Sequence, residues 1–201
     1  MTGDGVDISL VITNHNKGKF IDRAIRSCTA QLVLRRNIEV IVVDDCSSDD
    51  SLEIIREFGS DLHLFQNDSN RGVAFSSNVG LQNARGRYWM RVDADDFLNT
   101  YACAFMMAIL DENPDVHFVY CDHYRVDQRG RKITKVCLST DEALYNHGAG
   151  VLFRTQILRD VGGYDESLRN CEDYDLLYRL KSMNSVGYYL PVPLYRYYIH
   201  G

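Results

Sequence analysis

At residues 88–96 the chain reads Tyr88-Trp89-Met90-Arg91-Val92-Asp93-Ala94-Asp95-Asp96, an aromatic and apolar run that ends in three carboxylates. Such runs are typical of strands buried inside a parallel sheet, whose ligands bind at the carboxyl ends of the strands. Clustered carboxylates repel one another unless protons or a cation lie between them, and a hard divalent ion prefers oxygen ligands. The stretch therefore predicts a metal site at the end of a buried strand. The alternative is a polar loop with a helix cap.

Toward the N-terminus, apolar periodicity predicts strands and helices in alternation. The expected strands cover residues 8–13, 38–43 and 62–66, and the expected helices carry residues 21–28, 52–58 and 73–84. Residues 47–50 are predicted to start the second helix with capping side chains, and Gly59 to end it. The strand–helix–strand order predicts right-handed crossovers and a mostly parallel sheet with helices on both faces.

Toward the C-terminus the alternation weakens. In chain order we expect a helix at 101–111, a strand at 116–121, a hairpin at 124–134 with its turn at 128–130, a strand at 148–153, a helix at 156–161, a helix led by Glu172 and Asp173, and a strand at 186–190. The glycines before Val151 are predicted to let a ligand approach the backbone. No repeat or linker interrupts the pattern, so one α/β domain, an αβα sandwich over residues 1–201, is predicted.

Composition excludes some classes of function. The net charge of −6 and the lack of a long basic run weigh against nucleic-acid binding. The six cysteines include no C-x-x-C pair, which favours reduced thiols and a cytoplasmic setting. The N-terminus lacks the apolar core of a signal peptide, and the longest apolar run, Tyr101 to Leu110, is far short of the ~20 residues that span a bilayer.

Phosphate groups of a ligand need a binding site other than a glycine-rich loop. No G-x-G-x-x-G and no Walker lysine loop follows the first strand. A metal on Asp95 with Arg71 beside it would serve, and Asp44 or Asp45 could accept a hydrogen bond from a base N–H such as uracil N3. The alternatives are a solvated charge for Arg71 and helix capping for the aspartate pair.

The Glu172-Asp173 pair begins a helix with an apolar stripe. Carboxylates in a first helical turn are favoured by the helix dipole, so capping is one interpretation. The other makes one of the two a general base that removes a proton from an attacking hydroxyl.

The sequence resembles the family 2 glycosyltransferases, the inverting enzymes of the GT-A fold, over essentially its whole length. Each motif alone is weak, whereas their order and spacing together are specific. They are SLVITNHN (9–16), VIVVDDCSSD (40–49), NRG (70–72), ARG (84–86), the D-x-D in DADD (93–96), GGYDE (162–166), EDYD (172–175) and YRYYIH (195–200). Cys46 stands where the family usually has glycine, which puts the shape of that turn in doubt.

The resemblance implies a division of roles. Residues 1–96 would form the half that binds the nucleotide sugar, and residues 97–201 the half for the acceptor and the catalytic base, with a small antiparallel part of the sheet near the acceptor. The implied site residues are Thr13, Asn16, Asp44 and Asp45 for the nucleoside (Asp45 first for uracil), Arg71 for the diphosphate, Asp93 for the ribose side, Asp95 and His200 for the metal, Asp173 as the base and Glu172 to position a sugar. For His200 a terminal surface histidine is the alternative.

The implied reaction is a metal-assisted direct displacement that inverts the anomeric carbon. The resemblance implies Mn²⁺ or Mg²⁺ as cofactor, a UDP-sugar as donor, a glycan or glycolipid as acceptor, and a cytoplasmic enzyme that could rest on a membrane surface. Two rivals are a nucleotidyltransferase, which usually needs a more basic loop than residues 14–18, and a non-catalytic sugar-nucleotide-binding module of the same fold. Because relatives generally continue beyond His200, a truncated C-terminus is expected.

Overall fold

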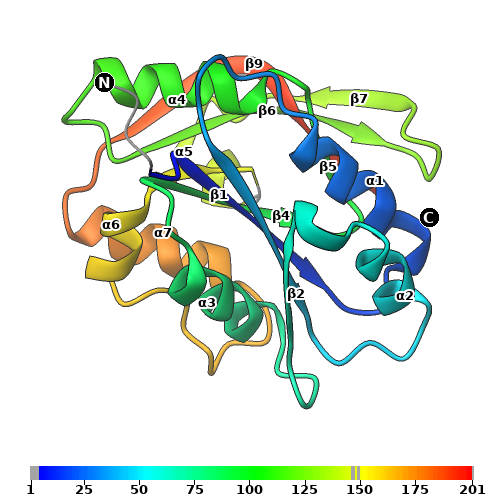
Figure 1. Cartoon of the computed structure of the whole chain (residues 1–201). Coiled ribbons are helices and arrows are strands. Elements are labelled where there is room, and N and C mark those ends of the chain that lie inside the picture. The colour runs from blue at the N-terminus through cyan, green and yellow to red at the C-terminus, as the bar shows by residue number, and fades with distance from the viewer. Residues whose placement is uncertain (1–4, 146–147, 149, 201) are drawn as a thin grey trace.

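A mixed sheet of nine strands forms the centre of a computed structural model that describes residues 5–145, 148 and 150–200 (Figure 1). The order across the sheet is β3-β2-β1-β4-β8-β6-β9-β5, and β7 pairs with β6 off this path. The strands are β1 (Ile8–Asn14), β2 (Ile38–Asp44), β3 (His63–Gln66), β4 (Tyr88–Asp93), β5 (Phe97–Leu98), β6 (Phe118–Val126), β7 (Lys132–Val136), β8 (Leu152–Arg154) and β9 (Gly187–Tyr198).

Helices connect most of these strands. They are α1 (Gly18–Thr29), α2 (Ser51–Arg56), α3 (Val73–Asn83), α4 (Ala102–Glu112), α5 (Asp141–Tyr145), α6 (Thr155–Asp160) and α7 (Glu172–Ser182), with a short 3₁₀ turn at Gly59–Asp61. Among the described residues, no helix combines the length and the apolar character needed to cross a membrane.

Strand directions follow from the pairings. Strands β1 to β4 pair in parallel, β8 pairs antiparallel with both β4 and β6, and β9 is parallel to β6. Strands β5 and β7 are antiparallel to β9 and β6. Most of the described strands, β1 to β4 with β6 and β9, therefore run in one direction. This confirms the predicted mostly parallel α/β sheet with an antiparallel part.

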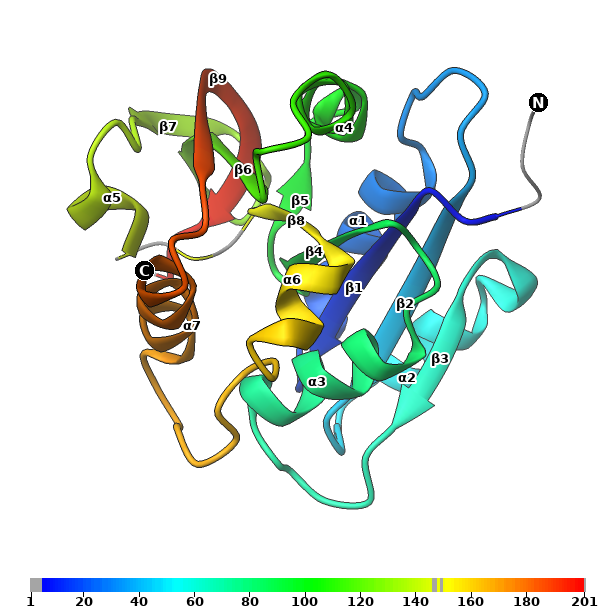
Figure 2. The ribbon, with the colours of Figure 1, turned by 90° about the vertical axis from the view of Figure 1, so that its left-hand side faces the viewer.

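Strand alternation separates the core into two layers. On β1 the residues Ile8, Leu10 and Ile12 pack against α1, α2 and α4, whereas Val11 packs in the other layer, with α3, α5, α6 and α7. Figure 2 shows α3 and α6 on one side of β1 and β2, with α1 on the other. On β4 the same alternation sends Trp89 toward the α7 layer. The side chains of Arg91 and Asp93 alternate along β4 in step with Trp89, so they lie on the same face of the sheet, the face on which α7 packs.

Several predicted elements differ in extent. The last strand is much longer than residues 186–190, because β9 continues to Tyr198 beside β6. The two-residue β5 has no signal in the sequence pattern, and it pairs with the distant strand β9. The second helix ends at Arg56, before Gly59, and no side-chain bond caps it at Asp50. The start of this helix is instead stabilised by Asp49, whose Oδ1 accepts a hydrogen bond from the Ser51 backbone N–H at 3.0 Å.

The predicted strand at 148–153 is mostly wrong. Residue 149 lies outside the described part of the chain, and the strand begins only at Leu152. Gly150 has φ +72°, and a Cβ there would come within 2.5 Å of the Tyr195 ring. A Cβ on Gly148 would come within 2.0 Å of the Asp173 Cβ. These glycines therefore make room for neighbouring side chains of the protein, whereas the sequence pattern predicts a ligand there.

Candidate functional site

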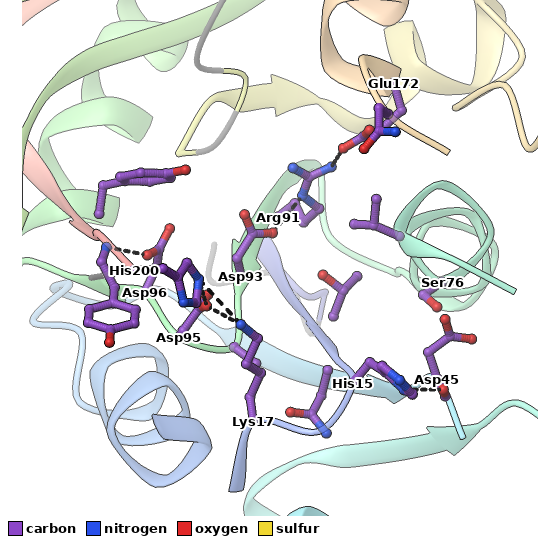
Figure 3. Close-up of a pocket in the computed structure, with 17 residues that line it drawn as sticks. His15, Lys17, Asp45, Ser76, Arg91, Asp93, Asp95, Asp96, Glu172 and His200 are labelled. Carbon is purple, nitrogen blue, oxygen red and sulfur yellow. Dashed lines mark hydrogen bonds and ion pairs between the residues drawn. The ribbon is translucent and has the colours of Figure 1, made fainter. Parts of the chain in front are cut away.

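A cleft of about 550 Å³ opens where β1 and β4 end, and the chain supplies its walls from four regions (Figure 3). The lining residues are Thr13 and Asn14 at the end of β1, with His15 and Lys17 after it; Asp45 just after β2, with Val73 and Ser76 of α3; Arg91 and Asp93 of β4, with Ala94, Asp95 and Asp96 after it; and Asn170, Glu172, Tyr197, Tyr198 and His200 from the C-terminal part. The location agrees with the rule that ligands of parallel sheets bind at the carboxyl ends of the strands.

Asp95 is the centre of one polar group in this cleft. Its Oδ2 lies 2.6 Å from Lys17 Nζ and 3.0 Å from His200 Nε2. The two nitrogens are 3.4 Å apart, and both side chains point toward Asp95 in Figure 3. The Asp95 side chain is only 12% exposed, so this is a sheltered contact. The structure thus brings together the two residues predicted to bind metal, 105 positions apart in the sequence.

Arg91 is the centre of a second group. This buried guanidinium lies 2.7 Å from Asp173 Oδ2, 3.1 Å from Asp93 Oδ1 and 3.4 Å from Glu172 Oε1. A buried arginine needs such partners, because an unpaired charge inside a protein is strongly unfavourable. One positive charge faces three carboxylates, so the group keeps a surplus of negative charge. Asp173 itself is not among the residues that line the cleft, whereas Arg91 and Glu172 are.

Burial and like charges alter the acidity of these carboxyls. Burial raises the pKa of Asp173 to about 6, with Glu172 and Asp93 adding to the rise and Arg91 opposing it. Burial likewise raises the pKa of Asp93 against the effect of Arg91. The pKa of Asp96 is raised well above its usual range by burial and by Asp93. A carboxylate whose pKa lies near neutrality is suited to general-base chemistry.

Asp44 and Asp45 have different surroundings although they are neighbours. Asp44 is fully buried, and its carboxylate accepts bonds from the Asn14 side chain and from Ser47. It does not line the cleft, and its contacts are those of a loop-stabilising residue. Asp45 lines the cleft while it accepts hydrogen bonds from Asn67 Nδ2 and from two backbone N–H groups, those of Arg71 and Gly72, at 2.7–2.8 Å.

Of the other residues predicted to bind the nucleotide, some line the cleft and some do not. Thr13 lines the cleft. Asn16 does not, and its Oδ1 instead accepts a hydrogen bond from the Ser48 backbone N–H at 2.8 Å. Arg71 also lies outside the cleft lining, half-exposed, with its guanidinium 3.7 Å from the centre of the Phe75 ring and 3.9 Å from Glu166. The roles of Asn16, Asp44 and Arg71 in binding stay predictions that these contacts do not support.

Sequence reasoning missed several residues of the cleft, notably Lys17, Arg91 and His15. A signal existed for Arg91, because a lone charge within a fully apolar strand requires buried partners. For Lys17 there was none, because its partner Asp95 is 78 positions away. His15 lines the cleft as well, and its Nδ1 contacts the Asp45 backbone oxygen at 2.8 Å.

The donor set around Asp95 fits a divalent cation in part. Asp95 Oδ2 and His200 Nε2 lie 3.0 Å from each other. An ion bound to both atoms could complete its coordination with oxygens of a bound diphosphate. The described residues contain no group of three or more histidine, cysteine, aspartate or glutamate side chains placed to hold a metal ion by themselves. Asp95 and His200 would therefore supply two of the ligands of a bound metal, and the substrate could supply others.

Comparison with known proteins identifies the family. The sequence profile of "Glycosyl transferase family 2" matches residues 9–162. The chain belongs to glycosyl transferase family 2. The predicted family, and with it the glycosyltransferase class in place of a nucleotidyltransferase, is thereby confirmed.

Curated relatives cover most of this chain. An uncharacterized glycosyltransferase of Haemophilus influenzae is 26% identical over 86% of the chain and 61% of its own length. The poly(ribitol-phosphate) beta-N-acetylglucosaminyltransferase TarS of Staphylococcus aureus is 30% identical over 82% of the chain and 30% of its own length. The chain spans about three-fifths of the length of the first three relatives it matches.

Solved structures confirm the GT-A fold. The crystal structure of residues 1–349 of S. aureus TarS in complex with UDP superposes with a TM-score of 0.81 at 25% identity, covering 96% of this chain and 61% of that one. The mannosyltransferase PcManGT of Pyrobaculum calidifontis, in complex with GDP-Man and Mn²⁺, gives a TM-score of 0.72 at 18% identity, covering 94% of this chain and 56% of that one. At that identity the likeness concerns the fold alone.

Proposed function

We propose that this domain is an inverting glycosyltransferase that moves a sugar from a nucleotide-diphosphate sugar to a hydroxyl group of a glycan or lipid-linked acceptor. The observation that carries the proposal is the geometry of the cleft. The Asp95–His200 pair lines the cleft at the end of β4, and so do Arg91, Asp93 and Glu172 of the Arg91 group, in which Arg91 lies 2.7 Å from Asp173. One group suits a diphosphate with its cation, and the other suits an acceptor hydroxyl.

The donor would bind with its base near Asp45 and Thr13. An ionised carboxylate has about four acceptor sites, and three N–H bonds occupy three of those on Asp45. The remaining site is on Oδ2 and could accept the N3–H of uracil. TarS structures with UDP and with UDP-GlcNAc support a uridine nucleotide, and the name of TarS makes UDP-N-acetylhexosamines the first donors to test.

Mn²⁺ or Mg²⁺ would be held by Asp95 and His200 together with diphosphate oxygens. When bound, such an ion offsets the negative charge that develops on the leaving diphosphate. Asp93, next to this site on β4, has its carboxylate fixed by Arg91 and would face the ribose side of the donor.

Asp173 would act as the general base. It takes the proton of the acceptor hydroxyl while the oxygen forms a bond to the anomeric carbon and the bond from that carbon to the diphosphate breaks. Attack from the face opposite the diphosphate inverts the configuration. Arg91 fixes the orientation of the Asp173 carboxylate, and Glu172, which lines the cleft, would position a sugar. Proton transfer of this kind contributes typically 10²–10⁴-fold in rate.

Titration calorimetry tests the donor site. UDP and GDP would each be titrated with and without Mn²⁺ into the wild-type chain, Asp95→Ala and the control Asp61→Ala, whose exposed carboxylate lies outside the cleft. We expect Mn²⁺-dependent UDP binding that Asp95→Ala abolishes and Asp61→Ala retains. Binding of neither nucleotide under any condition would contradict the proposed donor site.

Hydrolysis of the donor separates an enzyme from a binding module. Slow release of UDP from a UDP-sugar without acceptor is expected of the wild-type chain and not of Asp95→Ala. A chain that binds UDP but never turns over a UDP-sugar, with or without glycan acceptors, would be a non-catalytic module of the same fold.

A further inference from the structure

The ammonium group of Lys17 lies in the part of the cleft that we assign to the metal ion. Nζ lies 2.6 Å from Asp95 Oδ2 and 3.4 Å from His200 Nε2, the two atoms that we assign to the metal. Dashed lines in Figure 3 join the three side chains in one group. A metal ion bound to both atoms would have to displace the lysine, because the two cations would compete for the same carboxylate oxygen.

The backbone on both sides of Lys17 is held by hydrogen bonds, and on the N-terminal side the Asn16 backbone N–H donates to Ser47 Oγ at 2.9 Å. The Lys17 carbonyl accepts the backbone N–H groups of Phe20 and Ile21 at the start of α1. The next residue, Gly18, donates its N–H to Asp49 Oδ2 at 2.9 Å. A Cβ on Gly18 would lie 1.7 Å from Asp50 Oδ1, so the α2 loop packs directly on this turn. The loop after β1 therefore directs the Lys17 side chain at the end of β4.

The environment makes this ion pair stronger than an ordinary surface pair. The Lys17 side chain is 31% exposed and that of Asp95 12%, whereas pairs between fully exposed side chains contribute little. Sheltered charges are also screened less by salt. A second cation placed at Asp95 would meet repulsion from an ammonium only a few ångströms away, which lowers its affinity.

We propose that Lys17 is the resident counter-ion of Asp95, and that it keeps the metal site closed to divalent cations until the donor diphosphate arrives. The inference rests on the proposed function, since it concerns the same site. A diphosphate gives the ammonium group new anionic partners and adds oxygen ligands for the metal. Metal and nucleotide therefore bind with positive coupling, and by linkage each raises the affinity for the other.

Mn²⁺ binding, measured by electron paramagnetic resonance of the free ion, tests the inference without an activity assay. The variants are Lys17→Met and the control Lys19→Met, which removes an exposed lysine two residues further on. Without nucleotide, we expect Lys17→Met to bind Mn²⁺ at least tenfold more tightly than the wild-type chain, and Lys19→Met to match the wild type within twofold. With saturating UDP the advantage of Lys17→Met disappears, because the diphosphate already engages the lysine. Lys17→Arg, which keeps the positive charge, is expected to bind Mn²⁺ like the wild-type chain. This variant therefore tests whether the effect of Lys17→Met comes from the lost charge and not from the altered shape of the side chain.

Equal Mn²⁺ affinity of Lys17→Met and Lys19→Met without nucleotide would overturn the inference. If Asp95→Ala still abolished Mn²⁺ binding in the presence of UDP, the proposed donor site would stand and only the role of Lys17 would fall. If the wild-type chain bound no Mn²⁺ even with UDP, both the inference and the metal-dependent donor site would be wrong.

Discussion

Single residues of the Arg91 group have chemistry that depends on their partners. Asp173 is held by a 2.7 Å contact to Arg91, yet its pKa is raised to about 6, because burial and the carboxylates of Glu172 and Asp93 outweigh the guanidinium. Such a group is ionised at neutral pH and can still accept a proton in a transition state. Glu172 has the same side-chain chemistry but lines the cleft, so the two carboxylates are the natural pair to compare.

Replacing Asp173 by Asn should lower kcat by 10²–10⁴-fold, because the amide cannot accept the proton of the acceptor hydroxyl. Glu172→Gln, the matched control, should raise KM more than it lowers kcat if it only positions a sugar. Both would be measured as sugar transfer under saturating Mn²⁺. Near-normal turnover of Asp173→Asn together with an inactive Glu172→Gln would move the role of base to Glu172.

The raised pKa of Asp173 predicts how the rate of sugar transfer by the wild-type chain depends on pH. Only the ionised form of Asp173 can act as base, and its raised pKa means that this form is lost as the pH falls through about 6. Transfer should therefore rise from pH 5 to 7 and then level off.

At the level of elements, the loop between β2 and α2 begins at Asp45, which lines the cleft, and leads to the first residue of α2. Cys46 in this loop has φ +58°, a left-handed conformation that favours glycine. The resemblance leads us to expect glycine at this position, and the left-handed backbone of Cys46 is a conformation that glycine adopts readily. The Cys46 side chain is exposed, and its Sγ makes only a weak 3.8 Å contact to the Asp68 carbonyl.

Replacing Cys46 by Gly should raise the free energy of unfolding by roughly 0.5–1 kcal/mol, because relief of a left-handed conformation outweighs the added entropy of the unfolded chain. Urea unfolding provides the measurement. Cys46→Ala keeps the Cβ and removes the thiol, so it should stay within about 0.3 kcal/mol of the wild type. A gain of equal size in both variants would assign the effect to the thiol and not to the backbone.

At the level of the whole molecule, we expect the pH dependence of the free energy of unfolding to involve His123. This residue lies in β6, between β7 and the distant strand β9. His123 of β6 pairs across the backbone with Val136 of β7 and Tyr195 of β9, and its ring contacts that of Tyr197. Burial lowers the pKa of His123 to about 4, with Arg125 adding to the effect and Asp122 opposing it. In the unfolded chain the same histidine titrates near its ordinary value of 6.5.

The unfolded chain therefore binds more protons than the folded one between about pH 4 and 6.5, so this group makes the protein less stable as the pH falls through that range. His123→Leu should remove this part of the pH dependence, and the exposed His63→Gln should keep it. Urea midpoints from pH 7.5 to 4.5 provide the comparison. Parallel curves for His123→Leu and the wild type would show that His123 does not carry the effect.

Much of this protein follows from the sequence by itself. The apolar periodicity of residues 8–93 determined β1 to β4 and the helices between them, because these patterns are local in the sequence. Strands β1, β2 and β4 are buried along most of their length, whereas β3 at the edge of the sheet is only partly buried. The abrupt change from Val92 to Asp93-Ala94-Asp95-Asp96 marked the position of the cleft, since carboxylates cannot continue a buried strand. The motif order also determined the family, which the profile over residues 9–162 confirms.

Only the tertiary structure decided which charges meet. Lys17, Asp95 and His200 come from three distant parts of the chain, and Arg91 reaches Asp173 because strand parity and the position of α7 coincide. The same holds for Asp44 and Asp45, where one backbone step turns one carboxylate into the loop and the other toward the cleft. Periodicity reports which face a side chain takes, but the partner of a charge depends on packing between elements far apart in sequence. Electrostatic pairing is therefore a property of the folded molecule.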